Sequence, residues 1–426
     1  MLYFEKYFQK NSFQPSIEQK PNPDLHICVV IPCFNEPNII PSLESLYKCY
    51  KPKKSAEVII VINAPENSGN DIIRQNEETL NISKNWIDDH SDTRLKYHII
   101  VNNHLPAKHA GVGLARKIGM DEAAYRFNLI NNSQGIITGF DADSLCDPNY
   151  FIAIEEHFQL NPKSSGASIY FEHPFDTNFD SKQNTGIIQY ETHLRYLVQA
   201  MRYCGHPHAF HTVGSSFAVI ANEYIKQGGM NKRQAGEDFY FLQKIIELGN
   251  YTEITDTRVI PSPRISNRVP FGTGASIKKF MESDNEILQT YAFEAFLNLK
   301  KFFSLVHYFY SSDIDDIGNK IDGLDLTSRN FLVGINYLKE ISSIKENTLG
   351  INSFRNRFFR WFNAFMVIKY LNFASINGIE RVAIANASLQ LINELKLNKK
   401  LKNEKEILLL YRKLDQEGLG ITYLPQ

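Results

Sequence analysis

Two short acidic segments, Asp141-Ala142-Asp143 and Gly236-Glu237-Asp238, carry side chains that can do chemistry. The first directly follows an apolar run, Gly135–Phe140, whose length and composition predict a buried strand. If the extended geometry continues, side chains two residues apart point the same way, so Asp141 and Asp143 can share one hard divalent cation. Mg²⁺ or Mn²⁺ accepts a few carboxylate oxygens and keeps positions open for phosphate oxygens. We therefore expect a metal site with Asp143 and Asp141 as ligands.

The second segment stands immediately before FYFLQKIIELG, which has helical spacing. A carboxylate in the first turn of a helix is favoured by the macrodipole, so a cap or N-terminal charge is the structural alternative. In the functional interpretation, Glu237 or Asp238 is a general base that takes a proton from an incoming hydroxyl group.

The elements that must position these segments alternate along the first part of the chain. Apolar or β-branched runs predict strands, and amphipathic segments between them predict helices, as in a doubly wound α/β sheet with right-handed crossovers. The predicted strands are His26–Pro32, Glu57–Ile62, Tyr97–Val101, Gly135–Phe140 and Ala167–Phe171. Ligands of such sheets bind outside the carboxyl ends of the strands. The segments after the first four strands are all polar: PCFNE, NAPENSGND, NNHLPAKHAGVG and DAD.

Beyond Ala275 the pattern becomes helical, with few strand signals. The predicted helical segments are Tyr291–Tyr310, Ser328–Ile344, Phe354–Phe373 and Ile379–Leu397. We therefore expect an N-terminal extension over 1–23 that packs loosely, an α/β domain over 24–275, and a mostly helical C-terminal region over 276–426.

Composition excludes several classes of function. The chain has 426 residues, 47 acidic against 46 basic, and no basic stripe, which argues against a nucleic-acid partner. Its five cysteines are scattered without a CxxC pair, which fits a reduced, cytoplasmic compartment. No apolar window is long enough to predict a membrane span. The nearest one, Phe358–Ala374, contains Arg360 and Lys369 and predicts a buried amphipathic helix.

Four segments taken together resemble the family-2 glycosyltransferases of the GT-A fold: VVIPCFNE, GFDADSLCDPNYF, VGSSFAVIANEYIKQGGM and GEDFYFLQKIIELG. The resemblance covers roughly Ile27 to Ala275. It implies a Rossmann-like, mixed but mainly parallel sheet with helices on both faces. It also implies metal-dependent, inverting transfer of a hexosyl or N-acetylhexosaminyl group from a nucleoside-diphosphate-sugar donor to a hydroxyl of a glycan or glycolipid acceptor.

The resemblance also assigns roles. Pro32, Asn35 and Glu36 would lie near the nucleoside of the donor. Asp141 would hold the sugar and ribose, and Asp143 the metal and diphosphate. Asp238 would be the base, with Glu237 beside it. The sugar and acceptor pocket would be lined by Gly214, Ser215 and Ser216.

The chain departs from the family in two places. Where many relatives carry an aspartate-rich VDDGS turn that reads uracil, this chain has Asn63, so UDP-, GDP- and dTDP-sugars all stay open. The QxxRW motif of processive relatives is absent. Arg264 or Arg268 could instead clamp phosphate, although surface arginines are common.

A further donor-binding candidate is the cluster Lys108, His109, Gly111, Gly113 and Arg116. Glycines before a helix expose backbone N–H groups that suit a diphosphate or ribose. The structural alternative is a tight strand-to-helix turn with a solvated lysine.

Several alternatives stay open at this point. A retaining GT-A enzyme with a small acceptor, or a non-catalytic scaffold of the same fold, would look similar. A sugar nucleotidyltransferase would need a glycine-rich, basic loop after the first strand to hold a triphosphate. It is disfavoured because PCFNEP contains neither a glycine nor a basic residue. His206, His208 and His211 could bind zinc, but an acceptor loop is the preferred interpretation, and His173 could contribute there. The helical region could shape the acceptor site, pair two subunits as a homodimer, or make a peripheral contact with the inner face of the membrane.

Overall fold

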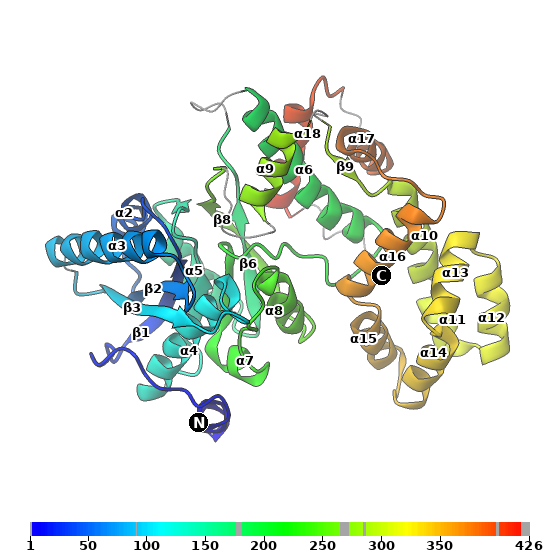
Figure 1. The fold of residues 1–426 in the computed structure, drawn as a ribbon. Helices are drawn as coiled ribbons and strands as arrows, with labels where there is room; N and C mark the ends of the chain where they lie inside the picture. Colours follow the sequence, from blue (N-terminus) through cyan, green and yellow to red (C-terminus); the bar gives the residue numbers. More distant parts are fainter. Residues whose placement is uncertain are drawn as a thin grey trace. The chain divides into compact units, whose positions relative to one another are not determined.

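A computed structural model describes residues 2–90, 92–175, 181–264, 272–283, 287–397 and 400–418. The chain forms two compact units (Figure 1). Unit 1 comprises residues 1–179 and 212–282, and unit 2 comprises residues 180–211 and 283–426. Residues 180–211 therefore group with the C-terminal region, whereas the boundaries expected from the sequence placed them in the α/β domain.

Within the described residues, unit 1 contains an eight-stranded sheet in the order β3-β2-β1-β4-β7-β6-β8-β5. The strands are β1 Leu25–Cys33, β2 Ser55–Pro65, β3 Leu95–Leu105, β4 Ile136–Gly139, β5 Leu145–Cys146, β6 Gly166–Phe171, β7 Phe217–Ile220 and β8 Thr252–Ile260. Strands β1 to β4 pair in parallel, β7 runs antiparallel to β4 and β6, and β5 runs antiparallel to β8. This mixed sheet, with a separate helical region, confirms the predicted fold class.

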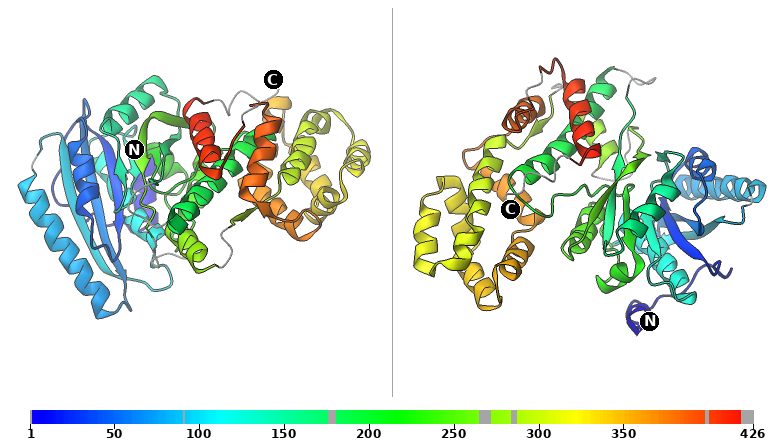
Figure 2. Two further views of the ribbon diagram at one scale, coloured as in Figure 1. Left: turned by 90° about the horizontal axis from the view of Figure 1, so that it is seen from above. Right: turned by 180° about the vertical axis from the view of Figure 1, so that it is seen from behind.

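The helices of unit 1 lie on both faces of this sheet (Figure 2). They are α1 Leu2–Lys10, α2 Ile40–Lys48, α3 Asn70–Asp89, α4 Val112–Leu129, α5 Tyr150–Leu160, α7 Ala221–Lys226, α8 Glu237–Ile246 and α9 Thr273–Glu282. The first helix after β1 begins at Ile40 with a proline in its first turn.

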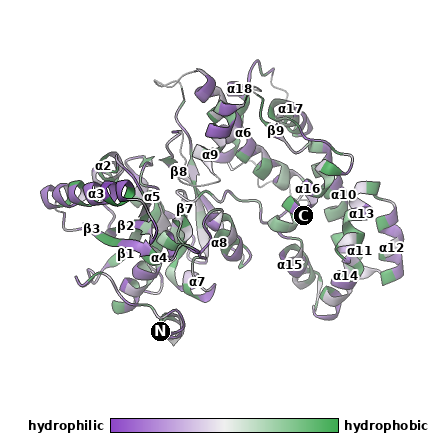
Figure 3. Cartoon of the chain, viewed as in Figure 1, coloured by the Kyte–Doolittle hydropathy of each residue, from purple (hydrophilic) through white to green (hydrophobic). Residues whose placement is uncertain are grey.

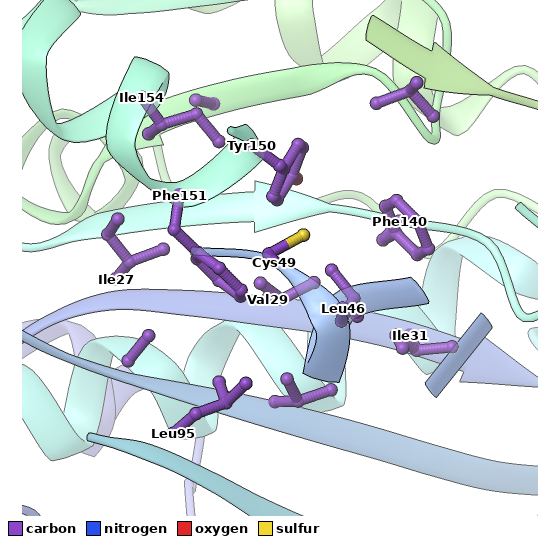
Figure 4. Close-up of a cluster of buried hydrophobic side chains, with 14 of the residues drawn as sticks. Ile27, Val29, Ile31, Leu46, Cys49, Leu95, Phe140, Tyr150, Phe151 and Ile154 are labelled. Atoms are coloured by element: carbon purple, nitrogen blue, oxygen red, sulfur yellow. The ribbon is translucent and has the colours of Figure 1, made fainter. Parts of the chain in front are cut away.

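Strand β1 is buried on both faces, which is why its sequence is apolar without alternation. On one face, Ile27, Val29 and Ile31 lie in a core with side chains of α2 and α5 (Figure 4). On the other face, α4 packs so closely that a Cβ on Gly119 would lie 2.5 Å from a methyl group of Val30. Both faces of β1 are thereby closed, and its end is the part available to a ligand.

The N-terminal extension is packed more tightly than the sequence predicts. Its helix α1 buries Phe4 and Tyr7, which are 2% and 6% exposed. The Tyr7 hydroxyl donates to Asp121 on α4 at 2.7 Å and accepts from the Lys117 ammonium at 2.6 Å. Helix α1 therefore braces α4, the helix that also carries Arg116.

Unit 2 is helical apart from the short β9 (Gln289–Thr290) and β10 (Val382–Ala383) in the part that the structure describes. Its helices are α6 Ser181–Tyr203, α10 Phe293–Ser304, α11 Val306–Ser311, α12 Ile314–Asp322, α13 Leu326–Gly334, α14 Tyr337–Glu346, α15 Ile351–Trp361, α16 Ala364–Ile376, α17 Ile384–Glu394 and α18 Glu404–Gln416. Two of the long helices that the sequence predicts are divided at asparagines. Asn336 separates α13 from α14 in a left-handed conformation (φ 53°), and the side chain of Asn363 caps α16 by accepting from the Met366 N–H.

Hydrophobic and hydrophilic residues are interspersed along the helices of unit 2 (Figure 3). Among the described residues, no helix combines the length and apolarity needed to cross a membrane. Helices α6 and α18 are joined by a buried ionic network in which Arg412 binds Glu191 at 2.7 Å and Arg195 binds Asp415.

Candidate active site

Arg116 connects the two acidic segments that the sequence singled out. Its guanidinium group, on α4 and 3% exposed, donates from Nη2 to Asp141 at 2.6 Å and from Nε to Glu237 at 3.0 Å. Its Nη1 donates to the Gly214 carbonyl at 2.7 Å. Asp141 follows β4, Glu237 begins α8 and Gly214 precedes β7, so one side chain holds three segments that are distant in the sequence.

A second arginine, Arg264, joins two further carboxylates, Asp143 and Glu36. Arg264, which follows β8, binds Asp143 through Nε at 2.9 Å and Glu36 through Nη1 at 2.9 Å and through Nη2. Glu36 is fully buried and also accepts the Asn38 N–H at 3.0 Å. Arg264 therefore brings Glu36 and Asp143 together, and their role in donor binding stays a prediction. The described partners of Arg264 are carboxylates, and its contact with phosphate stays a prediction.

Asp141 and Asp143 lie beyond the end of β4 and not within the strand. Strand β4 ends at Gly139, and the chain then turns, with the Ser144 N–H donating to the Asp141 carbonyl at 3.0 Å. The strand alternation used in the sequence argument therefore does not apply, and each aspartate contacts a different arginine.

Asp141 and Asp143 remain suitable ligands for a divalent cation. Their side chains are 38% and 24% exposed, so both can reach a ligand from solvent. Among the described residues, no group of three or more His, Cys, Asp or Glu side chains is arranged to hold a metal ion. Two carboxylates match a Mg²⁺ or Mn²⁺ ion that takes its other ligands from phosphate and water, and they do not match an all-protein metal site.

Glu237 and Asp238 are adjacent carboxylates at the start of α8. Burial, followed by the charge of Asp238, raises the pKa of Glu237 to about 7, and Arg116 opposes this rise. Desolvation also raises the pKa of Asp238, which is half-buried and accepts the Phe239 N–H at 2.7 Å. Gly214 leaves the space that this arrangement needs, because a Cβ there would lie 2.6 Å from Arg116 Nη2 and 3.1 Å from Asp238 Oδ2.

Gly113, at the start of α4, lies in close contact with other parts of the protein. A Cβ on Gly113 would lie 2.2 Å from the Arg233 carbonyl and 2.9 Å from the Glu237 Cβ. The absence of a side chain at Gly113 therefore allows α4 to approach the segment before α8, which is a structural role for this glycine. Lys108 is exposed on the preceding turn.

The carboxyl ends of β1 and β2 carry the other predicted donor residues. Pro32 and Asn35 are half-buried, and Asn35 is left-handed (φ 48°). Asn63 is buried, and its amide nitrogen donates to the Cys33 carbonyl at 3.0 Å and the Val61 carbonyl at 3.1 Å. The Asn63 amide hydrogens that could have contacted a nucleobase are thus used within the sheet.

The remaining predicted pocket residues have mixed positions. Ser215 and Ser216 are each 1% exposed beside Gly214, and their hydroxyl groups lie 3.3 Å apart. Arg268 lies outside the described residues.

The histidines do not form a shared site among the residues that the structure describes. In unit 2, His206 Nε2 contacts the Phe362 carbonyl at 2.9 Å, and His211 Nε2 contacts Asp415 at 3.0 Å. In unit 1, His173 lies 3.1 Å from the Thr273 hydroxyl. His208 lies beside His206, whose Nδ1 accepts the His208 N–H at 3.2 Å. Among the described residues, these histidines belong to no group of three or more possible metal ligands.

The residues that hold the strand ends together are not among the predicted site residues. Asn76 and Thr79 on α3 are 1% and 0% exposed, and Thr79 donates to the Glu36 carbonyl at 2.7 Å. The signal was present: small polar residues occur at positions 76, 79 and 83, one helical face, where an apolar stripe would be expected. Asn103, at the end of β3, was also overlooked.

No family model of known proteins matches the chain, and no curated protein matches it. Similar solved structures include S. aureus TarS 1-349 in complex with UDP-GlcNAc, with 14% identity and a TM-score of 0.41 over 79% of this chain and 92% of that chain. They also include the mannosyltransferase PcManGT from Pyrobaculum calidifontis in complex with GDP-Man and Mn²⁺, with 14% identity and a TM-score of 0.37 over 98% of this chain and 94% of that chain. Similarity at this level does not define the ligand or the activity of the present chain.

Proposed function

We propose that the protein is a glycosyltransferase that moves a sugar from a nucleoside diphosphate to an acceptor hydroxyl group by a single inverting displacement. The observation that carries the proposal is the Arg116 bridge, which brings Asp141 of the first acidic segment and Glu237 of the second onto one guanidinium group. A donor-binding carboxylate and a proton acceptor on either side of one reacting centre are what such a displacement requires.

Asp238 is the base in this proposal. Its carboxylate is half-buried, and desolvation raises its pKa, which makes it a stronger proton acceptor than an ordinary aspartate. Glu237, tied to Arg116, is the positioning residue that fixes the first turn of α8. Deprotonation of the acceptor hydroxyl by Asp238 would then coincide with its attack on the anomeric carbon.

The donor diphosphate would lie at the end of β4. Asp143 and Asp141 would hold a divalent cation there, which when bound neutralises charge on the departing diphosphate. Glu36 and Arg264 shape the adjoining end of β1. The nucleoside would extend along the ends of β1, β2 and β3, and a glycan or glycolipid would supply the acceptor.

A ligand panel tests the proposal directly. Ligand binding raises apparent stability by mass action, so the melting temperature of the full chain should rise with one class of nucleotide-sugar, and more so with Mn²⁺ present. The panel should include UDP-, GDP-, dTDP-, CDP- and ADP-sugars. If none of them shifts the melting temperature with or without Mn²⁺, the proposed function is wrong.

Two substitutions then separate binding from chemistry. Asp143→Ala should weaken Mn²⁺-dependent binding of the donor, measured by titration calorimetry. Asp238→Asn should leave donor binding nearly intact and lower turnover by about 10² or more, the scale of general-base catalysis. Asp256→Asn is the matched control, because that residue is exposed on β8 and should behave like the wild type. Normal turnover by Asp238→Asn would remove the base assignment.

A further inference from the structure

Asn76 is a buried amide whose orientation is determined by backbone groups. Its Oδ1 accepts the Asn35 N–H at 3.0 Å, and its Nδ2 donates to the Asn63 carbonyl at 3.0 Å. A backbone N–H can only donate and a carbonyl can only accept, so the oxygen and nitrogen of this side chain cannot be exchanged. Asn76 thereby ties the carboxyl ends of β1 and β2 to α3.

The second hydrogen of Asn76 Nδ2 determines the orientation of a neighbouring amide. It points to Asn103 Oδ1 at 2.9 Å, near the end of β3. Because Asn76 offers only a hydrogen at this position, Asn103 must turn its oxygen toward Asn76. The Asn103 Nδ2, a donor, is therefore directed away from Asn76, on a side chain that is half-buried.

The strand order places this donor at a useful separation from the acidic segments. Asn103 is on β3, and the order β3-β2-β1-β4 puts it three strands from the turn that carries Asp141 and Asp143. Neighbouring strands are about 4.8 Å apart, so the separation across the sheet is about 14 Å. A nucleoside diphosphate with its diphosphate at β4 would place its base toward β3.

We propose that Asn103 reads a carbonyl oxygen of the donor nucleobase through Nδ2, and that Asn76 is the positioning residue that sets this polarity. The inference rests on the proposed function and narrows its substrate class. Uracil, thymine and guanine present a carbonyl oxygen where cytosine and adenine present an amino group. The protein should therefore bind uridine, thymidine or guanosine diphosphates in preference to cytidine and adenosine diphosphates.

The test compares UDP, GDP, CDP and ADP by titration calorimetry in the presence of Mn²⁺. In Asn103→Asp, one carboxylate oxygen still accepts from Asn76, but the other presents an acceptor where the wild type presents a donor. We expect the ratio of keto-base to amino-base affinity to fall by about tenfold or more, the scale of exchanging one hydrogen bond for a repulsive pair. Using the ratio cancels the added charge, which acts on all four diphosphates alike.

Two more variants test the positioning role of Asn76. In Asn76→Asp, the carboxylate still accepts the Asn35 N–H but has no hydrogen for Asn103, so Asn103 should reverse its amide and shift the ratio in the same direction. Asn102→Asp is the matched control, because it places the same charge on the adjacent residue of β3 outside the Asn76 hydrogen bonds. It should keep the wild-type preference.

The outcomes separate this inference from the proposed function. If the wild type binds a keto-base diphosphate but Asn103→Asp weakens all four nucleotides by the same factor, Asn103 has only a structural role and this inference is wrong. If the wild type binds neither these four nucleotides nor dTDP, the proposed function fails and the inference fails with it. A wild type that prefers CDP or ADP overturns the inference alone.

Discussion

Replacing Arg116 by methionine tests whether this residue is the counter-ion that allows the two acidic segments to meet. Methionine fills much of the same volume but has no hydrogen to donate, so Glu237 and Asp141 would lose their bonds at 3.0 and 2.6 Å. Removing one partner of a buried ion pair costs about 3–5 kcal/mol. Glu237, which is 3% exposed, bears most of this cost, whereas Asp141 can rehydrate.

We therefore expect Arg116→Met to lower the free energy of unfolding of unit 1 by about 3 kcal/mol at pH 8. For a unit of this size, that corresponds to a fall in melting temperature of about 6–12 °C. The pKa of Glu237 is already raised by burial, and loss of Arg116 raises it further. An acid whose pKa is raised by folding binds more protons when folded, so stability decreases as pH rises. The loss should thus be larger at pH 8 than at pH 6.

Urea unfolding at both pH values, in EDTA, would measure this loss. The chain has two tryptophans, Trp86 in unit 1 and Trp361 in unit 2, so a Trp361→Phe background makes Trp86 a reporter of unit 1. Trp86 is 8% exposed and should report unfolding clearly. The double variant with Glu237→Gln, which removes the uncompensated charge, should recover part of the loss. A decrease below about 1 kcal/mol, or one that is equal at both pH values, would refute the counter-ion role.

Three further predictions follow from contacts already described. Tyr7→Phe removes a hydroxyl group bonded to two charged side chains and should cost about 1.5–3 kcal/mol, read from the urea midpoint of the Trp86 signal; an unchanged midpoint would mean that α1 contributes little. Turnover should increase with pH, because the Asp238 base must be ionised to accept a proton. The midpoint of this increase should lie above the pKa of an ordinary aspartate, because desolvation raises the pKa of Asp238. A flat pH profile of kcat/KM would contradict this prediction. Mn²⁺ should bind more tightly in the presence of UDP or GDP than alone. By linkage, Mn²⁺ should raise the affinity for the nucleotide by the same factor. Equal Mn²⁺ affinities with and without nucleotide in calorimetry would exclude coupling through Asp143.

Much of the fold could be predicted because its central strands are buried on both faces. The run HICVVIP corresponds to β1 and EVIIVI to the middle of β2, and both lie between helices. The assignment of residues 180–211 to unit 2 could not be predicted, because it depends on partners far along the chain. One example is Arg195 of α6, whose partner Asp415 lies in α18.

The acidic residues of the candidate site can be recognised in the sequence. The hydrogen bonds that join them cannot. The two acidic segments are recognisable from a few adjacent residues each. The Arg116 bridge instead joins positions 116, 141, 214 and 237, and no local pattern encodes that meeting. The Asn76 hydrogen bonds have the same character, because each partner belongs to a different strand end.

The two arginines explain how so many acidic side chains can lie near one another. Five carboxylates accompany two guanidinium groups in this part of unit 1: Glu36, Asp141, Asp143, Glu237 and Asp238 with Arg116 and Arg264. Without these counter-ions, repulsion and desolvation would force protonation or separation. The arginines differ in what else they can do. Arg116 is 3% exposed and holds three partners, which makes it a fixed bridge. Arg264 is 31% exposed and contacts Asp143, the carboxylate expected to take the cation. A cation on Asp143 would compete with that ion pair, so Arg264 is the arginine better placed to exchange a carboxylate for a phosphate oxygen.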